Sequence, residues 1–251
     1  MSPLPYSLPA IVREALLDAW ALLQPIDCLG CGAPDRACCA SCRDAIRAGA
    51  PVVVRCDADP GAPVWCAADY AGAVRGAVLS LKEAGRVDAA RPLAPLLRAA
   101  VVAALRAGAD AHRAPPGSWR VELVPIPTTR RALARRGHDP LRCIVARARL
   151  PSSRVLAPVR TWTSGEQKRR GRAGRLAART GRFRARGRLD GRAFLLVDDL
   201  ATTGATLAAA CDAVRAAGGV VIGCAVVAAP DLTRRGSLPV QPLPASPVTV
   251  S

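Results

Sequence analysis

Residues 194–206 read Phe-Leu-Leu-Val-Asp-Asp-Leu-Ala-Thr-Thr-Gly-Ala-Thr, an apolar run that ends at two carboxylates and a small, hydroxyl-rich loop. Phe194 to Val197 suit a buried parallel strand, and residues 206–217 have the Ala and Leu content of a helix that follows it. In open α/β sheets, such a strand-to-helix turn lies at the carboxyl edge, where ligands bind. The stretch therefore predicts an α/β fold with a ligand site at this turn.

The loop after the strand has the properties of a phosphate site. A helix N-terminus offers unpaired backbone N–H groups and the positive end of the helix dipole. Threonine hydroxyls add donors, and Gly204 lets the backbone take a positive φ or approach a phosphate closely. We therefore expect phosphate binding by Ala201, Thr202, Thr203, Gly204, Ala205 and Thr206.

Asp198 and Asp199 need a different explanation, because two carboxylates facing a phosphate would repel it. They are expected to accept hydrogen bonds from sugar hydroxyls or to approach hydrated Mg²⁺, and a ribose 5-phosphate suits both the acids and the loop. The segment resembles the signature of type I phosphoribosyltransferases. That resemblance implies that the acidic pair contacts the ribose of phosphoribosyl pyrophosphate as catalytic residues, with Mg²⁺ as cofactor. The alternative is a capped strand-loop-helix with solvated acids.

Length and composition favour one α/β domain plus a small module in the 251-residue chain. Hydrophobic residues make up 51% but aromatic residues only 3%, so Ala, Val and Leu must build the core. The chain has no run of eighteen apolar residues, and residues 11–23 include Arg13, Glu14 and Asp18. We therefore expect neither a membrane span nor a signal peptide, and a cytoplasmic location.

The positive charge is concentrated in one segment. Residues 130–192 contain 20 Lys or Arg and 3 Asp or Glu, so this segment accounts for the whole net charge of +17. The imbalance indicates an anionic partner, either a polyphosphate in a pocket or nucleic acid along a face, unless the charges are simply solvated. Arg130 and Arg131, followed by Arg135 and Arg136, could hold a diphosphate; an exposed helix start is the alternative.

Two C-x-x-C pairs predict a small metal site. Cys28-Leu-Gly-Cys31 and Cys39-Ala-Ser-Cys42 are separated by seven residues, and four thiolates at this spacing favour a structural Zn²⁺ with no open position for water. Buried cytosolic thiols are the alternative. Cys38 is left without a role.

Pro and Gly residues mark boundaries that divide the chain into four parts. We expect an amphipathic helix within residues 1–24, the zinc module at 25–45, the main domain at 64–230 and a disordered Pro-rich tail at 231–251. The main domain should contain strands at 64–70, 121–124, 155–157 and 220–228, and helices at 73–84, 92–107 and 141–150. Residues 161–188 have little apolar periodicity and are interpreted as a mobile lid.

The order of these parts resembles the ComF (competence protein F) family. The resemblance rests on the cysteine pairs, Tyr70-Ala-Gly, Leu81-Lys82-Glu-Ala-Gly85, Val124-Pro-Ile-Pro127, Arg135-Arg-Gly137 and the acidic signature. It implies a type I phosphoribosyltransferase-like parallel sheet flanked by helices, with an N-terminal zinc-binding module. It also implies a link to imported single-stranded DNA in natural transformation, alongside a helicase-like partner.

The chain departs from the family pattern at His138-Asp139-Pro140, where Phe-Asn-Gln is usual. His138 could serve as a general base, but a surface histidine beside arginines is favoured. Two functions stay open at this point. One is transfer of a phosphoribosyl group to an undefined acceptor, and the other is a non-catalytic scaffold that binds ribose phosphate or single-stranded DNA.

Overall fold

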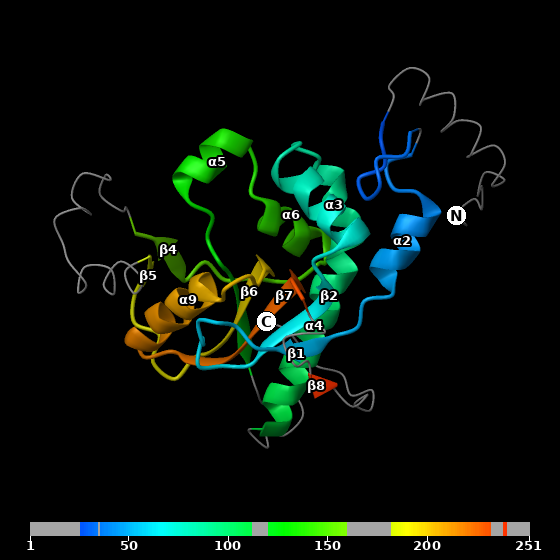
Figure 1. The fold of residues 1–251 in the computed structure, drawn as a ribbon. Helices are drawn as coiled ribbons and strands as arrows, with labels where there is room; N and C mark the ends of the chain where they lie inside the picture. Colours follow the sequence, from blue (N-terminus) through cyan, green and yellow to red (C-terminus); the bar gives the residue numbers. More distant parts are fainter. Residues whose placement is uncertain (1–25, 35, 112–119, 160–181, 232–237, 240–251) are drawn as a thin grey trace, which may run out of the picture.

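The computed structural model describes residues 26–34, 36–111, 120–159, 182–231 and 238–239 (Figure 1). Its main sheet has the strand order β3-β6-β7-β2-β1-β8. The first four of these strands run parallel, and β1 and β8 add antiparallel pairs at one edge. The strands are β1 (Val52–Val54), β2 (Val64–Asp69), β3 (Val121–Pro125), β6 (Ala193–Leu200), β7 (Val220–Ala229) and β8 (Leu238–Pro239). This mostly parallel sheet confirms the predicted α/β fold class.

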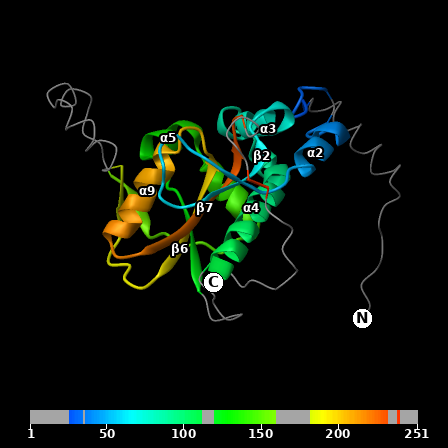
Figure 2. The ribbon, with the colours of Figure 1, turned by 60° about the horizontal axis from the view of Figure 1, so that its bottom comes forward.

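Helices cover both faces of the sheet. They are α2 (Ala40–Arg47), α3 (Gly72–Lys82), α4 (Ala90–Ala111), α5 (Arg130–Arg136), α6 (Pro140–Arg147) and α9 (Ala205–Ala216), with a 3-10 turn η1 (Val87–Ala89). A second, two-stranded sheet pairs β4 (Leu156–Pro158) with β5 (Phe183–Ala185). In Figure 2, α9 and α4 lie on opposite sides of β6 and β7.

The signature strand β6 is buried on both faces, as its continuous apolar run predicted. Leu195 and Val197 belong to the core cluster on the α4 side, whereas Phe194 and Leu196 belong to the cluster on the α9 side. All four are fully buried, because successive side chains of a strand point to opposite faces and a helix covers each face.

Residues 87–111, which include α4, form the one stretch of the described residues that is long and apolar enough to cross a membrane. Half of its most apolar window is buried inside the fold. Four residues of α4, Leu93, Leu97, Ala100 and Val101, are fully buried in the core cluster on that face. The stretch therefore has the character of a core helix and gives no clear membrane span.

The carboxyl ends of the parallel strands meet at one edge. Pro125, the last residue of β3, is aligned with Val197, and Asp198 is aligned with Val226 of β7. In Figure 1, α3, α5 and α6 lie above the tips of β6 and β7. Segments that are far apart in sequence therefore surround the acidic residues of β6.

Three segments differ from the sequence-based expectation. The sheet starts before residue 64, because Val52–Val54 pair with β2 as β1. In the expected tail, Leu238–Pro239 pair with β1 and so cover part of the edge of the sheet. Residues 232–237 and 240–251 of that tail lie outside the described residues. In the expected lid, Phe183–Ala185 form β5, which pairs with β4. Phe183 stands between arginines in the sequence, and its side chain is buried in the core cluster on the α9 side. Residues 160–181 of the lid and 1–25 of the N-terminal segment also lie outside the described residues.

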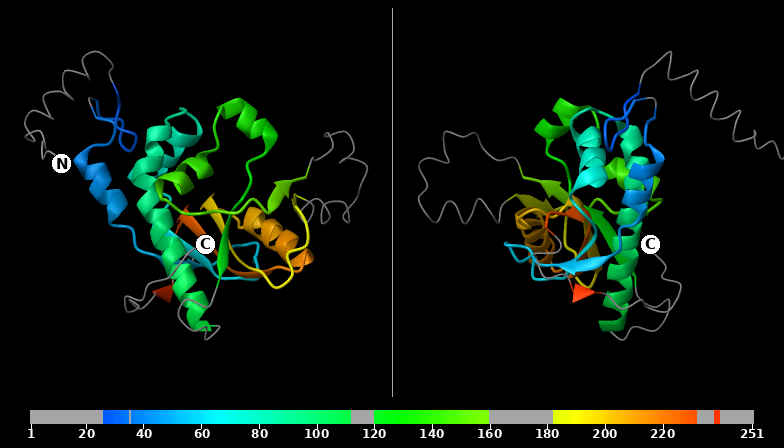
Figure 3. Two further views of the ribbon diagram at one scale, coloured as in Figure 1. Left: turned by 180° about the vertical axis from the view of Figure 1, so that it is seen from behind. Right: turned by 45° about the vertical axis from the view of Figure 1, so that its right-hand side comes forward.

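The cysteine module, residues 26–45 of the described chain, is packed against α3 rather than standing apart (Figure 3). Leu29 belongs to the same core cluster as the apolar face of α3, and its carbonyl accepts a hydrogen bond from Ser80 Oγ at 3.2 Å. Gly76 of α3 allows the closest approach. A Cβ there would lie 2.4 Å from the carbonyl oxygen of Gly30 and 2.7 Å from that of Leu29.

We predict that Gly76→Ala destabilises the protein although alanine is the better helix former by about 1 kcal/mol. The added methyl group meets backbone atoms, which cannot rotate away, and such overpacking typically costs about 1–3 kcal/mol. Urea unfolding of the metal-loaded protein measures the change. Ser80→Ala, which removes one hydrogen bond to the same loop, is the milder control, and a stabilised Gly76→Ala variant would contradict the observed packing.

Candidate functional site

The acidic pair, Asp198 and Asp199, lies within the last three residues of β6. Strand alternation directs Asp199 to the side of α3 and Asp198 to the side of α9. Lys82 Nζ, at the end of α3, lies 2.8 Å from Asp199 Oδ1, and the two side chains are only 21% and 13% exposed. Lys82 therefore neutralises one of the two carboxylates.

The other carboxylate is held differently. Burial, followed by the neighbouring Asp199 carboxylate, raises the pKa of Asp198 to about 8, although the Asp199 N–H donates to Asp198 Oδ1 at 2.9 Å. Lys82 lowers this pKa and Asp139 raises it. The fold therefore favours the protonated form of the Asp198 carboxyl group. Together with the ion pair between Lys82 and Asp199, this lowers the negative charge of the acidic pair.

Residues 201–206, named here the phosphate loop, join β6 to α9. Ala201 is buried and its N–H donates to Ala228 O at 3.0 Å, so that amide is already satisfied. Thr202 and Thr203 are exposed, and Ala205 and Thr206 open α9. Gly204 is the N-cap of α9 with φ +79, which confirms the positive φ expected from the sequence.

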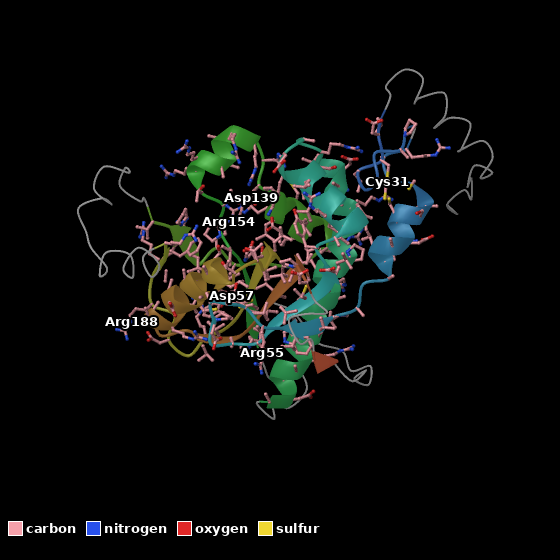
Figure 4. All side chains as sticks on the ribbon, viewed as in Figure 1. Cys31, Arg55, Asp57, Asp139, Arg154 and Arg188 are labelled. Atoms are coloured by element: carbon pink, nitrogen blue, oxygen red, sulfur yellow. The ribbon has the colours of Figure 1, made fainter. Side chains whose placement is uncertain are left out.

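A segment before β2 braces the phosphate loop. Ala58 N–H donates to Thr203 O at 2.8 Å, and a Cβ on Gly204 would lie 2.4 Å from Cys56 Cβ. Arg215 of α9 donates to Pro60 O and Gly61 O at 2.7 and 2.8 Å. In Figure 4, Asp57 of this segment lies beside α9. Gly204 is thus needed for protein packing as well as for its conformation.

The structure does not join Arg130 and Arg131 to the acidic pair. Both side chains are exposed at the start of α5, where Thr129 Oγ1 accepts from Ala132 N at 3.3 Å as the N-cap. Among the described residues, no hydrogen bond or ion pair links either arginine to the acidic pair or the phosphate loop. Their assignment as substrate contacts therefore stays a prediction.

His138 is partly exposed, and its two ring nitrogens lie 3.0 Å from Arg136 O and 2.8 Å from Leu81 O. The sequence did not indicate the second contact, because the carbonyl of Leu81 is brought in by the fold. His138 connects the end of α5 to the end of α3. Its neighbour Asp139 caps α6 by accepting from Arg142 N at 3.2 Å.

The four predicted ligands Cys28, Cys31, Cys39 and Cys42 come together, with all their sulfurs within 4.8 Å of one another. Sulfurs around a tetrahedral zinc ion lie about 3.8 Å apart, given Zn–S bonds of about 2.3 Å. The Cys31 and Cys39 sulfurs are 3.8 Å apart. The donor set and its spacing therefore fit a structural zinc ion.

Cys28 is prepared to bind a cation. Burial opposes ionisation of this thiol, but hydrogen bonds from the N–H groups of Cys39, Cys31 and Gly30 lower its pKa to about 6. Cys39 N donates to Cys28 Sγ at 3.3 Å. Cys38 is outside the cluster, and its thiol instead lies 3.8 Å from the carbonyl oxygen of Cys39.

We predict that replacing Cys38 leaves the metal content of the protein unchanged, whereas replacing a cysteine of the cluster lowers it. Cys31→Ser and Cys42→Ser should lose most of one bound zinc per chain and unfold at lower temperature, because three thiolates leave the site incomplete. Cys38→Ser is the matched control and should retain both the metal and the melting temperature. Elemental analysis of dialysed protein measures the metal content of each variant. Equal metal loss in all three variants would contradict the placement of Cys38 outside the site.

A second prediction concerns pH. Because folding raises the pKa of Asp198 above the value of about 3.9 in unfolded chains, the folded state loses stability as pH rises from about 4 to 8. Asp198→Asn keeps an acceptor for the Asp199 N–H and carries no charge. Its melting temperature should therefore exceed that of the parent at pH 8.5, by about 2–4 °C for each kcal/mol recovered, and match it near pH 4. Asp212→Asn, on exposed α9 surface, should show no such trend. A pH-independent difference for Asp198→Asn would contradict the buried environment.

Comparison with known proteins agrees with this geometry. The family model of the phosphoribosyl transferase domain matches residues 149–238, which contain the acidic pair, the phosphate loop and α9. No curated protein matches the chain significantly. The chain therefore contains a type I phosphoribosyltransferase-like domain, joined to a four-cysteine cluster that is compatible with a zinc module.

Proposed function

We propose that this protein binds phosphoribosyl pyrophosphate and transfers the phosphoribosyl group to an acceptor nucleophile. One observation carries the proposal. A buried parallel strand delivers Asp198 and Asp199 to the carboxyl edge, directly before a glycine-capped loop at the N-terminus of α9, within the matched domain. This arrangement suits a sugar flanked by a phosphate.

The residues of the chain have separable tasks in this reaction. Thr202, Thr203 and the first amides of α9 hold the 5-phosphate, while the acidic pair orients the ribose hydroxyls. The bond from C1 to the diphosphate oxygen breaks with its electron pair leaving on pyrophosphate. The acceptor nucleophile then bonds to C1 and loses its proton. Positive charge develops on the ribose ring during this exchange, and the oriented oxygen atoms of the acidic pair favour it electrostatically.

Mg²⁺ belongs to the donor in this proposal. Among the described residues, the cysteine cluster is the one group of three or more potential ligands close enough to hold an ion. The acidic pair by itself supplies too few ligands for an all-protein Mg²⁺ cage, which agrees with the usual binding of this ion through substrate phosphates. When bound, the ion would neutralise charge on the leaving diphosphate.

The finer assignment is to the ComF family. The Leu81-Lys82 and Arg135-Arg-Gly137 segments support it, because Lys82 contacts Asp199 and lines one cavity with Arg135 and Arg136. The cysteine pairs support it as well, because they come together in one cluster that packs against α3. This resemblance implies that the protein acts in the cytoplasm on imported single-stranded DNA, together with a helicase-like partner. Arg130 and Arg131 keep their predicted role as further substrate contacts.

A non-catalytic scaffold that binds single-stranded DNA is the second candidate. It is favoured by the concentration of all the net positive charge in residues 130–192. Titration with a fluorescent oligonucleotide at two salt concentrations separates the candidates. Phosphate-driven binding weakens steeply with salt and should depend on the arginines between residues 169 and 188.

We predict that Asp198→Asn combined with Asp199→Asn abolishes binding of phosphoribosyl pyrophosphate, because both ribose contacts lose their carboxylates. Calorimetry of the zinc-loaded protein with Mg²⁺ measures the affinity, and circular dichroism verifies the fold of the variant. Asp212→Asn on α9 is the control for loss of a carboxylate. Unchanged affinity in the folded double variant would refute the proposed site. Pyrophosphate release in the presence of candidate bases then tests catalysis and searches for the acceptor.

A further inference from the structure

A cavity of about 480 Å³ lies between the cysteine module and the first turns of α4. Figure 3 shows α2 of the module beside α4, and residues of both helices line the cavity. The apolar part of the lining comes from Leu29, Ala37, Cys38, Pro92 and Pro95. The volume falls in the range of binding sites, about 300–1,000 Å³. The charge around the cavity and the chain that enters beside it indicate its occupant.

The lining carries more positive than negative charge. Its three cations are Arg43, Arg47 and Arg91, all exposed and so at the rim. Its single carboxylate, Asp88, is already compensated by Arg86, whose Nη2 lies 2.6 Å from Asp88 Oδ2. Arg47 also lies 3.9 Å from Asp44, an exposed contact that contributes little. An occupant with apolar side chains and a few carboxylates therefore suits this cavity.

Arg86 also marks the place where the N-terminal segment joins the described structure. Its guanidinium group donates to the carbonyl oxygen of Asp27 and, at 3.5 Å, to that of Ala37. Ala37 and Asp88 line the cavity, so one guanidinium group connects the backbone of residue 27 to two points of the lining. The extended chain from Leu23 to Asp27 spans at most about 14 Å. Residues that precede Leu23 can therefore reach the cavity.

The sequence of this N-terminal segment matches the lining. Residues 11–23, the expected amphipathic helix, place five apolar residues on one helical face: Val12, Leu16, Ala19, Trp20 and Leu23. At about 100° per residue, further apolar residues widen this face to about half of the circumference, and Asp18 and Glu14 follow along one edge. With Arg13 as its one base, the segment is net negative in a chain of charge +17. A helix this short is marginal in water by itself, so its apolar face needs a partner.

We propose that residues 11–23 of this same chain dock in the cavity, with the apolar face toward Pro92 and Pro95 and the two carboxylates toward the arginines at the rim. The inference goes beyond the proposed function and does not depend on it. Burial of apolar surface supplies most of the docking free energy, and the exposed charges add a modest share. Docking clamps the cysteine module onto α4 and covers the half-buried thiol of Cys38.

Hydrogen exchange and alkylation of the full-length, zinc-loaded protein test the docking. In the parent, the amides of residues 11–23 should exchange slowly and iodoacetamide should react slowly with Cys38. Leu16→Asp should raise both rates about tenfold, because an unpaired carboxylate against apolar walls opposes docking. Ala21→Asp, on the opposite face of the expected helix, is the matched control and should change them less than about twofold. Cys143, half-buried on α6, is the internal reference for alkylation.

Variants of the cavity test the same contact from the other wall. Ala37 is exposed, so Ala37→Trp adds an indole to the lining without disturbing the core, and it should raise exchange in residues 11–23 about tenfold by filling the site. Ala45→Trp is the control, since Ala45 is exposed on α2 and lies outside the lining. Arg43→Gln combined with Arg91→Gln should raise exchange about twofold to fivefold, the scale of exposed ion pairs.

The outcomes decide between occupants of the cavity. Exchange as fast in the parent as in Leu16→Asp would overturn the inference, and so would equal effects of Leu16→Asp and Ala21→Asp. No effect of Ala37→Trp would overturn the assignment to this cavity. Protection that disappears on dilution, together with dimeric elution from size exclusion, would assign the cavity to a second copy of the chain and overturn docking within one chain. Zinc content and melting temperature verify each fold, and because the two walls are tested by separate variants, one variant that fails to fold leaves the other decisive.

Discussion

The ion pair between Lys82 and Asp199 holds the two halves of the carboxyl edge together. It joins the end of α3 to the signature strand across 117 residues of sequence, in a place where both side chains are largely shielded from water. A buried charge without a partner is expensive, so removing either side would leave an uncompensated ion. Through Lys82, the acidic pair is also continuous with a cavity lined by Arg135, Arg136 and His138. The charge arrangement of the whole site therefore depends on this contact.

The same contact lowers the negative charge at the point where two carboxylates are adjacent. Lys82 compensates the charge of Asp199, and burial raises the pKa of Asp198. Two groups near this edge are thus destabilised in the protein: the Asp198 carboxyl group, whose pKa is raised, and Arg136 Nε, which has no hydrogen-bond acceptor among the described residues. Destabilised groups of this kind are characteristic of binding sites, because a ligand that satisfies them binds more tightly.

The cysteine module is connected to the site through α3. Gly76 and Ser80 hold the first cysteine knuckle on one face of this helix, and Lys82 two residues later reaches the acidic pair. Disruption of the cysteine cluster would therefore loosen the helix that positions Lys82. This arrangement connects the stability of the cysteine module to the position of the Lys82 ammonium group.

The sequence by itself determined the local features: the buried strand with its acidic end, the glycine turn into α9, and four cysteines with the spacing of one metal site. Each depends on neighbours within a few residues, so periodicity and backbone preferences suffice to predict it. The partner of Asp199, the bridging position of His138 and the strands β5 and β8 were decided by tertiary structure. They depend on contacts between distant segments, and a Lys or His in the sequence has the same local preference whichever surface it finally meets. The sequence therefore predicted the local segments in which the candidate residues stand, and the fold decided which of these residues lie together.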